Sequence, residues 1–473
     1  MENKYIIIPE RDLGVHEECG IIGIYSKEEK SLARDTYLGL FALQHRGQES
    51  AGIALSMPGR RISYYKNMGL VHEVFTEENL QLLPDSKIAI GHTRYSTTGS
   101  SNAINAQPVV FFGKHGRSAL AHNGNIVNTG EIKETLLKKG HMFQSSTDSE
   151  VIATLINYLS DISMEEGIIQ ACKMLNGAFS LVIIAEDKLI AIRDKHGIRP
   201  LILGKRGEDI VIASESCALD SIDATPIRDL EPGEILSIGA DGMKSILYEK
   251  EQKKLCVFEY VYLARSDSVM DGTSVYESRL NCGKKLAELY KIDADIVAGV
   301  PDSAIVSARG YSMVSGIPQI DALSKNRYVG RTFIQPDQLQ RENSVKIKLN
   351  AFKRNIDGKR LILIDDSIVR GTTSKKIISL LRASGAKEVH MLLASPMVKF
   401  PCYLGVDMDT KEQLIAGYKT KDEICKTIGA DSLNYFPLEE LVKSAGGGPF
   451  CTGCFDGNYG VPINTRAGKF ELE

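Results

Sequence analysis

The segment that most constrains the fold runs from Arg360 to Ser374, with the sequence RLILIDDSIVRGTTS. Its apolar start predicts a buried strand, which ends in two consecutive carboxylates, Asp365 and Asp366. The Ser, Gly and Thr residues of 367–373 then lead into a helix, whose first N–H groups and dipole favour a phosphate. Carboxylates at the carboxyl end of a strand lie where doubly wound sheets bind ligands. The segment therefore predicts a phosphate site in an α/β domain.

Two other interpretations of this segment compete with a ribose-phosphate site. A nucleotide P-loop is excluded, because no Gly-Lys-Ser/Thr follows the glycine. An ordinary strand, turn and helix in which an Asp caps the helix is the plain alternative. Asp365 and Asp366 together are instead suited to accept hydrogen bonds from ribose hydroxyls, directly or through Mg²⁺, which prefers oxygen ligands. Two adjacent acids before the complete loop favour this functional interpretation.

Apolar strands alternate with a helical stretch around the motif. Three apolar runs have the length of strands: Ile296–Gly299, Leu361–Ile364 and Glu388–Ala394. Ser374–Ala383 carries apolar residues at helical spacing, and Gly385 supplies a stop signal. This alternation is typical of βαβ units. It predicts an α/β domain with a doubly wound parallel sheet over residues 251–473.

The preceding part of the chain has a different texture. It contains short β-like runs between glycine turns: Gly20–Ile24, Lys87–Ile90, Ser118–Ala121, Phe179–Ile184, Lys188–Arg193, Leu201–Leu203, Ile210–Ala213 and Glu234–Ile238. Two helical stretches interrupt them, near Ser31–Leu43 and Ser149–Leu159. Runs of strands with grouped helices predict a layered α+β domain over residues 19–250. A polar, charged stretch at Tyr248–Lys254 joins it to the second domain.

Length, charge and cysteine usage limit the class of protein. The 473 residues exceed one ordinary core, so two or three domains are expected. Net charge is −3, from 57 Lys plus Arg against 60 Asp plus Glu. This balance gives no electrostatic case for binding nucleic acid or an anionic membrane surface. Nine cysteines are an odd number for a disulfide framework, so metal binding, nucleophilic catalysis and burial are left.

The sequence predicts neither a membrane segment nor a secretory signal. No apolar run approaches the roughly 20 residues that span a bilayer. The apolar run at the N-terminus, Tyr5–Ile8, is short and is followed at once by Pro9 and charged residues. We therefore expect a cytoplasmic protein.

The strand, the two acids and the glycine-threonine loop resemble the fingerprint of type I phosphoribosyltransferases. The resemblance implies a second loop that holds pyrophosphate, here Val300–Ala304 (VPDSA). It places Ser303, Asp365 and Asp366 nearest to a bound Mg²⁺. The residues that it implies for phosphoribosyl pyrophosphate are Asp365, Asp366, Ser367, Gly371, Thr372, Thr373 and Arg331.

Arg331 lies in a segment that resembles the mobile catalytic loop of that family. The segment, Lys325–Glu342, also contains Arg327 and Arg341. Its guanidinium groups suit the negative charge that develops on a departing pyrophosphate. An ordinary long surface loop is the alternative.

The first predicted domain begins with Cys19, in the glycine-containing run CGIIGIY. Alone it would indicate no more than a buried residue. Three further stretches accompany it: Leu43–Ser50 (LQHRGQES), Gly91–Thr98 (GHTRYSTT) and His122–Asn125 (HNGN). Glycine beside His, Arg and Asn in a strand-rich domain indicates polar groups displayed at strand ends.

The four stretches together resemble the class II glutamine amidotransferases, which have the αββα layers of the N-terminal-nucleophile hydrolase fold. In that family the nucleophile is the first residue, and its free α-amine is the general base. An α-amine titrates near pH 7.7 to 8.0, which suits this role, whereas a backbone amide does not. The resemblance therefore implies that residues 1–18 are a propeptide cut after Glu18, and that Cys19 is inactive until then.

The same resemblance implies a role for each matching residue. Cys19 would attack the side-chain carbonyl of glutamine and form a thioester, and the Asn123 side chain with the Gly124 N–H would form the oxyanion hole. The residues implied for holding glutamine or the nucleophile's amine are Arg94 for the α-carboxylate, Asp148 for the α-ammonium and Arg46 near the amine. Three histidines are expected to be structural: His45, His92 and His122.

Two of the remaining cysteines, Cys451 and Cys454, form a C-T-G-C pair. Such a pair is compatible with redox activity, zinc or an iron–sulfur cluster. The positions of Cys256 and Cys402 match the other ligands of cluster-containing amidotransferases, so the resemblance implies a [4Fe–4S] cluster, with zinc as the alternative. The other thiols are expected to be packed in the interior: Cys172, Cys217, Cys282 and Cys425.

The order of the two halves resembles the glutamine phosphoribosylpyrophosphate amidotransferase family across nearly the whole chain. The resemblance implies transfer of ammonia from glutamine to 5-phosphoribosyl 1-pyrophosphate, the committed step of purine synthesis, through an internal channel. It also implies a homotetramer and feedback inhibition by purine nucleotides. Another glutamine-dependent synthase, such as the glucosamine-phosphate type, leaves Asp365 and Asp366 unexplained. A ligand-sensing regulator leaves the Cys19 set unexplained, and an inactive precursor that is never cleaved is the third alternative.

Overall fold

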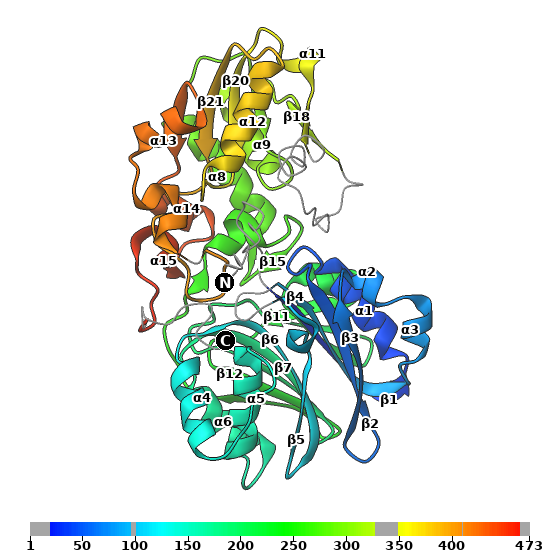
Figure 1. Ribbon diagram of the computed structural model, residues 1–473. Coiled ribbons are helices and arrows are strands. Elements are labelled where there is room, and N and C mark those ends of the chain that lie inside the picture. Colours follow the sequence, from blue (N-terminus) through cyan, green and yellow to red (C-terminus); the bar gives the residue numbers. More distant parts are fainter. Residues whose placement is uncertain (1–18, 96–100, 327–348, 409, 464–473) are drawn as a thin grey trace, which may run out of the picture.

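The computed structural model describes residues 19–95, 101–326, 349–408 and 410–463, which form two domains (Figure 1). Within these residues no helix is long and apolar enough to cross a membrane. The predicted propeptide, residues 1–18, lies outside the described part of the chain, and so do Arg327, Arg331 and Arg341 of the predicted catalytic loop.

Two antiparallel sheets form the first domain, in the lower half of Figure 1. One has the strand order β11-β9-β10-β1-β4-β2-β3, with the bounds β1 Gly20–Lys30, β2 Ser50–Met57, β3 Arg61–Met68, β4 Ser86–Arg94, β9 Ile202–Arg206, β10 Asp209–Ala213 and β11 Thr225–Asp229. The other has the order β13-β12-β8-β7-β6-β5, with the bounds β5 Val109–Gly113, β6 Gly116–Ile126, β7 Gly177–Ala185, β8 Lys188–Arg193, β12 Glu234–Gly239 and β13 Gly242–Leu247.

Helices cover the outer face of each sheet (Figure 1). Beside the first sheet lie α1 Leu32–Ala42, α2 Val71–Val74, α3 Glu77–Gln81 and α7 Ser216–Asp220. Beside the second sheet lie α4 Thr129–Lys138, α5 Asp148–Leu159 and α6 Met164–Met174.

Alternation of side chains along the strands explains the layers of this domain. In β1, Ile22 packs on the helical side, whereas its neighbour Ile21 faces the second sheet. In β7, Ile183 packs with the helices of the second sheet, whereas Val182 faces the first sheet. Both faces of these strands are therefore buried, which is why they are continuous apolar runs. The predicted αββα arrangement is confirmed.

A parallel sheet forms the second domain, with the order β17-β20-β21-β22. Its bounds are β17 Ile296–Gly299, β20 Arg360–Asp365, β21 Glu388–Leu393 and β22 Ser432–Tyr435. In β20, Leu363 packs with α12 (Thr372–Ala383), whereas Ile364 packs with the opposite helices, α8 (Val275–Leu289) and α9 (Ile305–Ser315). Helices thus cover both faces, and the predicted doubly wound α/β architecture is confirmed.

Shorter elements complete the second domain. They are β15 Val269–Met270, β16 Thr273–Ser274, β18 Leu323–Lys325, β19 Leu349–Ala351, α11 Lys353–Ile356, α13 Lys421–Ile428, α14 Leu438–Ser444 and α15 Gly453–Asp456.

The two domains meet at a short segment after β13. In it, β14 (Leu255–Cys256) pairs in parallel with β23 (Phe450–Cys451), so the start of the second domain is joined to its C-terminal part. A π-helical turn, Glu259–Leu263, follows β14. Such turns are frequent at functional sites. The predicted boundary between residues 250 and 251 falls between β13 and β14, and it stays a prediction.

Candidate functional site

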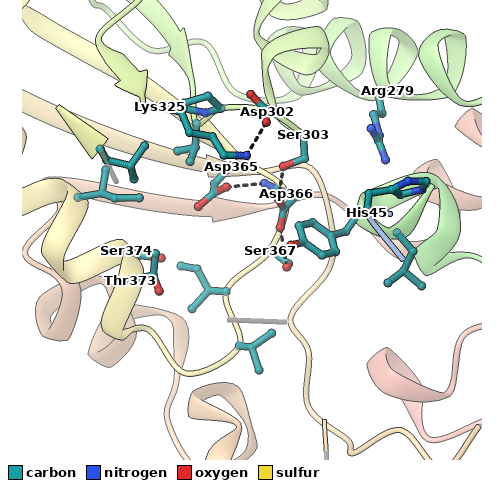
Figure 2. A pocket seen from close by; sticks show the side chains of 18 of the residues that line it. His45, Arg279, Asp302, Ser303, Lys325, Asp365, Asp366, Ser367, Thr373 and Ser374 are labelled. Atoms are coloured by element: carbon teal, nitrogen blue, oxygen red, sulfur yellow. Dashed lines mark hydrogen bonds and ion pairs between the residues drawn. The ribbon is translucent and has the colours of Figure 1, made fainter. Parts of the chain in front are cut away.

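A cavity of about 580 Å³ lies at the carboxyl ends of β17 and β20 (Figure 2). The loop after β20, residues 365–371, and the loop after β17, residues 300–303, both line it. Parallel strands end at the same edge of a sheet, so two loops distant in sequence meet here. The cavity is therefore lined by both the predicted phosphate loop and the loop that the resemblance assigns to pyrophosphate.

The two carboxylates share this cavity with a hydroxyl. Ser303 Oγ donates to one oxygen of Asp366, and Ser367 Oγ donates to the other at 2.8 Å. The Asp366 N–H donates to Asp365 Oδ1 at 3.0 Å. Burial raises the pKa of Asp365 well above its usual range, and the neighbouring carboxylate raises it further; burial also raises the pKa of Asp366. Buried oxygen donors with excess negative charge match the preference of Mg²⁺.

The phosphate loop leads directly into α12. Gly371 is the N-cap of this helix and has a φ of 78°, a left-handed conformation that glycine adopts without strain. Thr373 lines the cavity, whereas Thr372 does not, and Thr372 Oγ1 is buried with no hydrogen-bond partner in the part of the chain that the structure describes. The helix N-terminus and its dipole are thus directed at the cavity, as the sequence predicts for a phosphate site.

The wall opposite Thr373 contains residues from elsewhere in the chain (Figure 2). Arg279 of α8 is buried there, and its guanidinium donates to the Tyr260 and Ala264 carbonyl oxygens, both at 2.8 Å. His45 and Gln48, from the first domain, also line the cavity. Residues of both domains therefore line the cavity.

The predicted nucleophile, Cys19, precedes β1 and is buried. Because Gly20 pairs with Thr93, Cys19 lies beside the end of β4, where Arg94 is. Its Sγ lies 3.5 Å from the Tyr95 carbonyl oxygen. Burial raises the pKa of the Cys19 thiol to about 11, with a smaller opposing effect of the positive charge of Arg94. A thiol in this environment needs a base to become a nucleophile.

The predicted oxyanion hole lies at the end of β6. Asn123 is fully buried, and among the described residues neither its amide N nor its amide O has a hydrogen-bond partner. Gly124 has a φ of 139°, and a Cβ there would lie 2.0 Å from the Ala178 carbonyl oxygen, so no other residue fits. An unpaired buried amide is costly unless a ligand pairs with it. This orphaned group is therefore consistent with a binding role.

The predicted ammonium acceptor, Asp148, is the first residue of α5 and is buried. It accepts a hydrogen bond from the Ile126 N–H at 3.2 Å, and His122 Nδ1 lies 3.5 Å from it. His122 and the other hydrogen bonds hold the pKa of Asp148 below its usual value despite burial. The charges of Asp148 and Arg94 both act on the Cys19 thiol, so the structure brings these three residues together.

The predicted structural histidines occupy different settings. His92 is fully buried; its Nε2 lies 3.0 Å from the His122 carbonyl oxygen, and burial lowers its pKa to about 3. His45, by contrast, lines the cavity at the carboxyl ends of β17 and β20. Its position there was not predicted, because the LQHRGQES stretch does not indicate which way the imidazole points.

Arg46 lies behind the nucleophile, with an exposed fraction of 1%. Its Nε donates to the Cys19 carbonyl oxygen at 3.2 Å, and its other nitrogens donate to Glu215 and to Glu259. The sequence did not single out either glutamate. Glu259 lies three residues after Cys256, which drew attention to this stretch for its thiol alone, and Glu215 follows a strand with no motif around it. Charge-paired buried acids of this kind leave no local pattern.

The four predicted cluster cysteines converge at the domain junction. Cys256 and Cys451 are Cα partners in β14 and β23. Cys454 lies in α15, and the Lys399 and Phe400 N–H groups donate to its carbonyl oxygen, which holds the loop that contains Cys402 beside it. Burial raises the pKa of Cys454 well above its usual value, and the three other cysteines raise it further.

In this structure the four sulfurs do not form a complete set of metal ligands. All nine cysteines are free thiols, and among the described residues no group of three or more His, Cys, Asp or Glu side chains is arranged to hold a metal ion. Three buried sulfur donors and the half-buried Cys402, within mutual electrostatic reach, nevertheless fit a thiolate-bound cluster or zinc. The metal and the role of each site residue stay predictions.

Comparison with known proteins adds independent evidence. The glutamine amidotransferase domain family matches residues 92–221. The amidophosphoribosyltransferase of Methanocaldococcus jannaschii is 49% identical, and the alignment covers 94% of this chain and 98% of that protein. The chain belongs to the amidophosphoribosyltransferase family. The amidophosphoribosyltransferase of Bacillus subtilis is 44% identical, with 95% of both chains covered.

Solved structures extend this family membership to the fold. The glutamine phosphoribosylpyrophosphate amidotransferase of Bacillus subtilis, in complex with ADP and GMP, matches with a TM-score of 0.90 and 42% identity, covering 96% of this chain and all of that one. A structure described as the allosteric regulatory enzyme of purine biosynthesis matches with a TM-score of 0.90 and 43% identity, covering 96% of this chain and 98% of that one. The predicted combination of an N-terminal-nucleophile amidotransferase domain and a type I phosphoribosyltransferase domain is confirmed.

Proposed function

We propose that this amidophosphoribosyltransferase transfers ammonia from glutamine to 5-phosphoribosyl 1-pyrophosphate. The products are 5-phosphoribosylamine, glutamate and pyrophosphate, and the reaction is the committed step of purine nucleotide synthesis. One observation carries the proposal beyond family membership. His45 and Gln48, close in sequence to Arg46 behind the nucleophile, form a wall of the cavity that contains Asp365 and Asp366. A site that makes ammonia and a site that consumes it thus share one interface.

The glutamine half of the reaction begins at Cys19. Removal of residues 1–18 would create the α-amine that takes the thiol proton, since the buried thiol with a pKa of about 11 is protonated at neutral pH. The thiolate attacks the glutamine amide carbon, and the orphaned Asn123 amide with the Gly124 N–H stabilises the resulting oxyanion. The α-ammonium returns this proton to the amide nitrogen, which leaves as ammonia, and water then hydrolyses the thioester to glutamate and the free thiol.

Arg94 and Asp148 would orient the substrate. A guanidinium pairs with the α-carboxylate of glutamine, and a carboxylate pairs with its α-ammonium. The low pKa of Asp148 keeps this group ionised at neutral pH, so it binds a cation without a proton transfer. Both side chains are buried, which strengthens such pairs.

The second half takes place at the cavity. The loop after β20, with Ser367, Gly371 and Thr373, would bind the ribose phosphate. Asp365 and Asp366 would orient the ribose hydroxyls. Ser303 and the two carboxylates would hold Mg²⁺, which supplies positive charge to the pyrophosphate group. Arg331 would contribute charge to the departing pyrophosphate.

The four junction cysteines would hold a [4Fe–4S] cluster, with zinc as the alternative. They are Cys256, Cys402, Cys451 and Cys454. Since β14 and β23 belong to the two ends of the second domain, the cluster would be structural. Iron, zinc and acid-labile sulfide measured in anaerobically purified protein test this assignment. Four irons and four sulfides per chain support the cluster, and one zinc without sulfide contradicts it.

Purine nucleotides are the proposed feedback inhibitors, and the supporting observation is the Bacillus subtilis relative bound to ADP and GMP. We also propose a cytoplasmic homotetramer, without a nucleic-acid or membrane partner. Light scattering of the purified chain tests the oligomeric state. A monomer at micromolar concentration would contradict it.

The deciding experiment measures glutamate and pyrophosphate release together. Protein purified without oxygen, with its N-terminus determined by mass, is given glutamine with and without phosphoribosyl pyrophosphate and Mg²⁺. The proposal expects strong stimulation of glutamate release and an equal amount of pyrophosphate. Glutamate release that is indifferent to the ribosyl donor contradicts the assigned acceptor. No activity from a chain that begins at Cys19 contradicts the catalytic assignment.

A further inference from the structure

Glu215, the N-cap of α7, is a buried carboxylate that lies in neither predicted site but is hydrogen-bonded toward both. On one side, its Oε2 accepts from the Arg265 N–H at 3.0 Å and from Ser268 Oγ at 2.7 Å. On the other, its Oε1 lies 2.7 Å from His45 Nε2 and accepts from Arg46 Nη1. One side chain thus connects segments from both domains.

The contacts of Arg46 lead from this carboxylate to the nucleophile. Its Nε donates to the Cys19 carbonyl oxygen at 3.2 Å. Its outer nitrogens donate to Glu259 at 2.8 and 3.0 Å. A guanidinium is planar, so two carboxylates that fix its outer nitrogens also fix the direction of Nε. Glu215 is therefore one of the two carboxylates that orient the guanidinium bound to the Cys19 carbonyl.

Two other contacts of Glu215 lead to the cavity. His45 and Arg265 both line it. His45 Nε2 lies 2.7 Å from Glu215, and its Nδ1 lies 3.2 Å from the Ala42 carbonyl oxygen. The His45 imidazole and the Arg265 guanidinium, which also pairs with Asp267, are the groups at this wall that a polyanionic ligand can contact.

We infer that Glu215 is the positioning residue that transmits occupancy of the phosphoribosyl pyrophosphate cavity to Cys19. A pyrophosphate group competes with Glu215 for His45 and for the Arg265 segment. The hydrogen bond between Glu215 and Arg46 then differs between the filled and the empty cavity. The placement of the Cys19 carbonyl, which Arg46 contacts, differs with it. Such a difference in contacts is what a coupling between two sites requires. This inference rests on the proposed function.

The test substitutes Glu215→Gln, which keeps the shape but replaces one acceptor oxygen by a donor that cannot pair with Arg46. The readout is the ratio of glutamine hydrolysis with and without phosphoribosyl pyrophosphate. We expect this ratio to fall about tenfold, within the range typical of coupling between sites. Pyrophosphate release driven by added ammonia, which bypasses Cys19, should stay close to that of the unsubstituted enzyme.

A matched control is available in the same domain. Glu234 is also buried, and it accepts from both outer nitrogens of Arg228, from the Glu231 N–H and from Ser245 Oγ. It lines neither site. Glu234→Gln should leave the stimulation ratio unchanged, so equal losses in the two variants would overturn the inference in favour of a general packing defect.

Two milder variants decide the matter if Glu215→Gln does not fold. Ser268→Ala and His45→Gln each remove one contact between Glu215 and the cavity side, and each should lower the stimulation ratio. An unchanged ratio in both overturns the inference. The unsubstituted enzyme separates the two hypotheses: no stimulation there refutes the proposed function, whereas stimulation that is equally strong in Glu215→Gln refutes this inference alone.

Discussion

The proposed glutamine site and the proposed phosphoribosyl pyrophosphate cavity are built in opposite ways. The first is made of side chains at the ends of strands β1, β4 and β6, and Cys19, Arg94 and Asn123 are all buried. The second is an open cavity of about 580 Å³, made of loops after strands β17 and β20. A site set in buried strands is preorganised for covalent chemistry, whereas loops around a cavity suit a large, charged substrate. Variants that disable one site and spare the other test this contrast.

The largest effect is expected for Cys19→Ser. It removes the thiol, so glutamine-dependent product formation should fall at least about 10⁴-fold, as nucleophile removal does elsewhere. Reaction with added ammonia should persist, because the cavity is untouched. Pyrophosphate release with glutamine or with ammonium chloride measures both. Loss of both activities would show that the two sites are not separable.

Asn123→Ala removes a single oxyanion donor. The kcat of glutamine hydrolysis should fall about 10² to 10³-fold, with a smaller change in KM. The side chain is buried without a partner, so its loss should not lower the melting temperature much. Steady-state kinetics and a thermal melt check this. A large rise in KM with kcat unchanged would assign Asn123 to substrate binding.

Asp366→Asn affects the other site. Ammonia-dependent and glutamine-dependent product formation should fall together, by about 10 to 100-fold, because the substitution weakens the proposed Mg²⁺ site. Glutamine hydrolysis without the ribosyl donor should remain. A higher Mg²⁺ requirement in the variant supports the assignment. An unchanged Mg²⁺ dependence would remove Asp366 from the metal site.

The smallest effect concerns His92, whose burial lowers its pKa to about 3. The unfolded chain binds a proton below about pH 6.5 and the folded chain does not. This contribution to stability is therefore present above pH 6.5 and is lost as the pH falls toward 3. In His92→Gln, the free energy of unfolding should depend less on pH, by up to about 1.4 kcal/mol per unit.

Urea unfolding followed by circular dichroism between pH 6.5 and about 4 measures that slope. His72→Gln, at an exposed position, is the control. Equal slopes in the two variants and the unsubstituted chain would show that His92 takes up its proton without unfolding.

The sequence predicts those helices and strands in which apolar residues recur at a regular spacing or form a continuous run. The predicted strands at 188–193 and 296–299 coincide with β8 and β17. The helix α4 and the hairpin of β2 and β3 were not predicted. In α4, only Thr129, Ile132 and Leu136 are buried, which is a weak signal, and β3 is largely polar and mostly half-buried or exposed.

The candidate site residues, too, are only partly predictable from the sequence. Motifs such as Asp365–Asp366 are predictable because one short segment contains the chemistry. The environment of Arg46 is not, because Glu215 and Glu259 reach it from positions far along the chain, one in each domain. A buried ion pair depends on tertiary placement, and the direction of the His45 side chain depends on it as well.

The parallel pairing of β14 with β23 has a consequence for biosynthesis. Leu255 and Cys256, near the start of the second domain, pair with Phe450 and Cys451, near its end. During translation the first domain emerges complete before this pairing is possible. The second domain cannot close until the ribosome has released its last segment. In a chain truncated before Phe450, the first domain would therefore be folded and the second domain would lack the pairing of β14 with β23. We expect quality-control proteases to degrade such a chain.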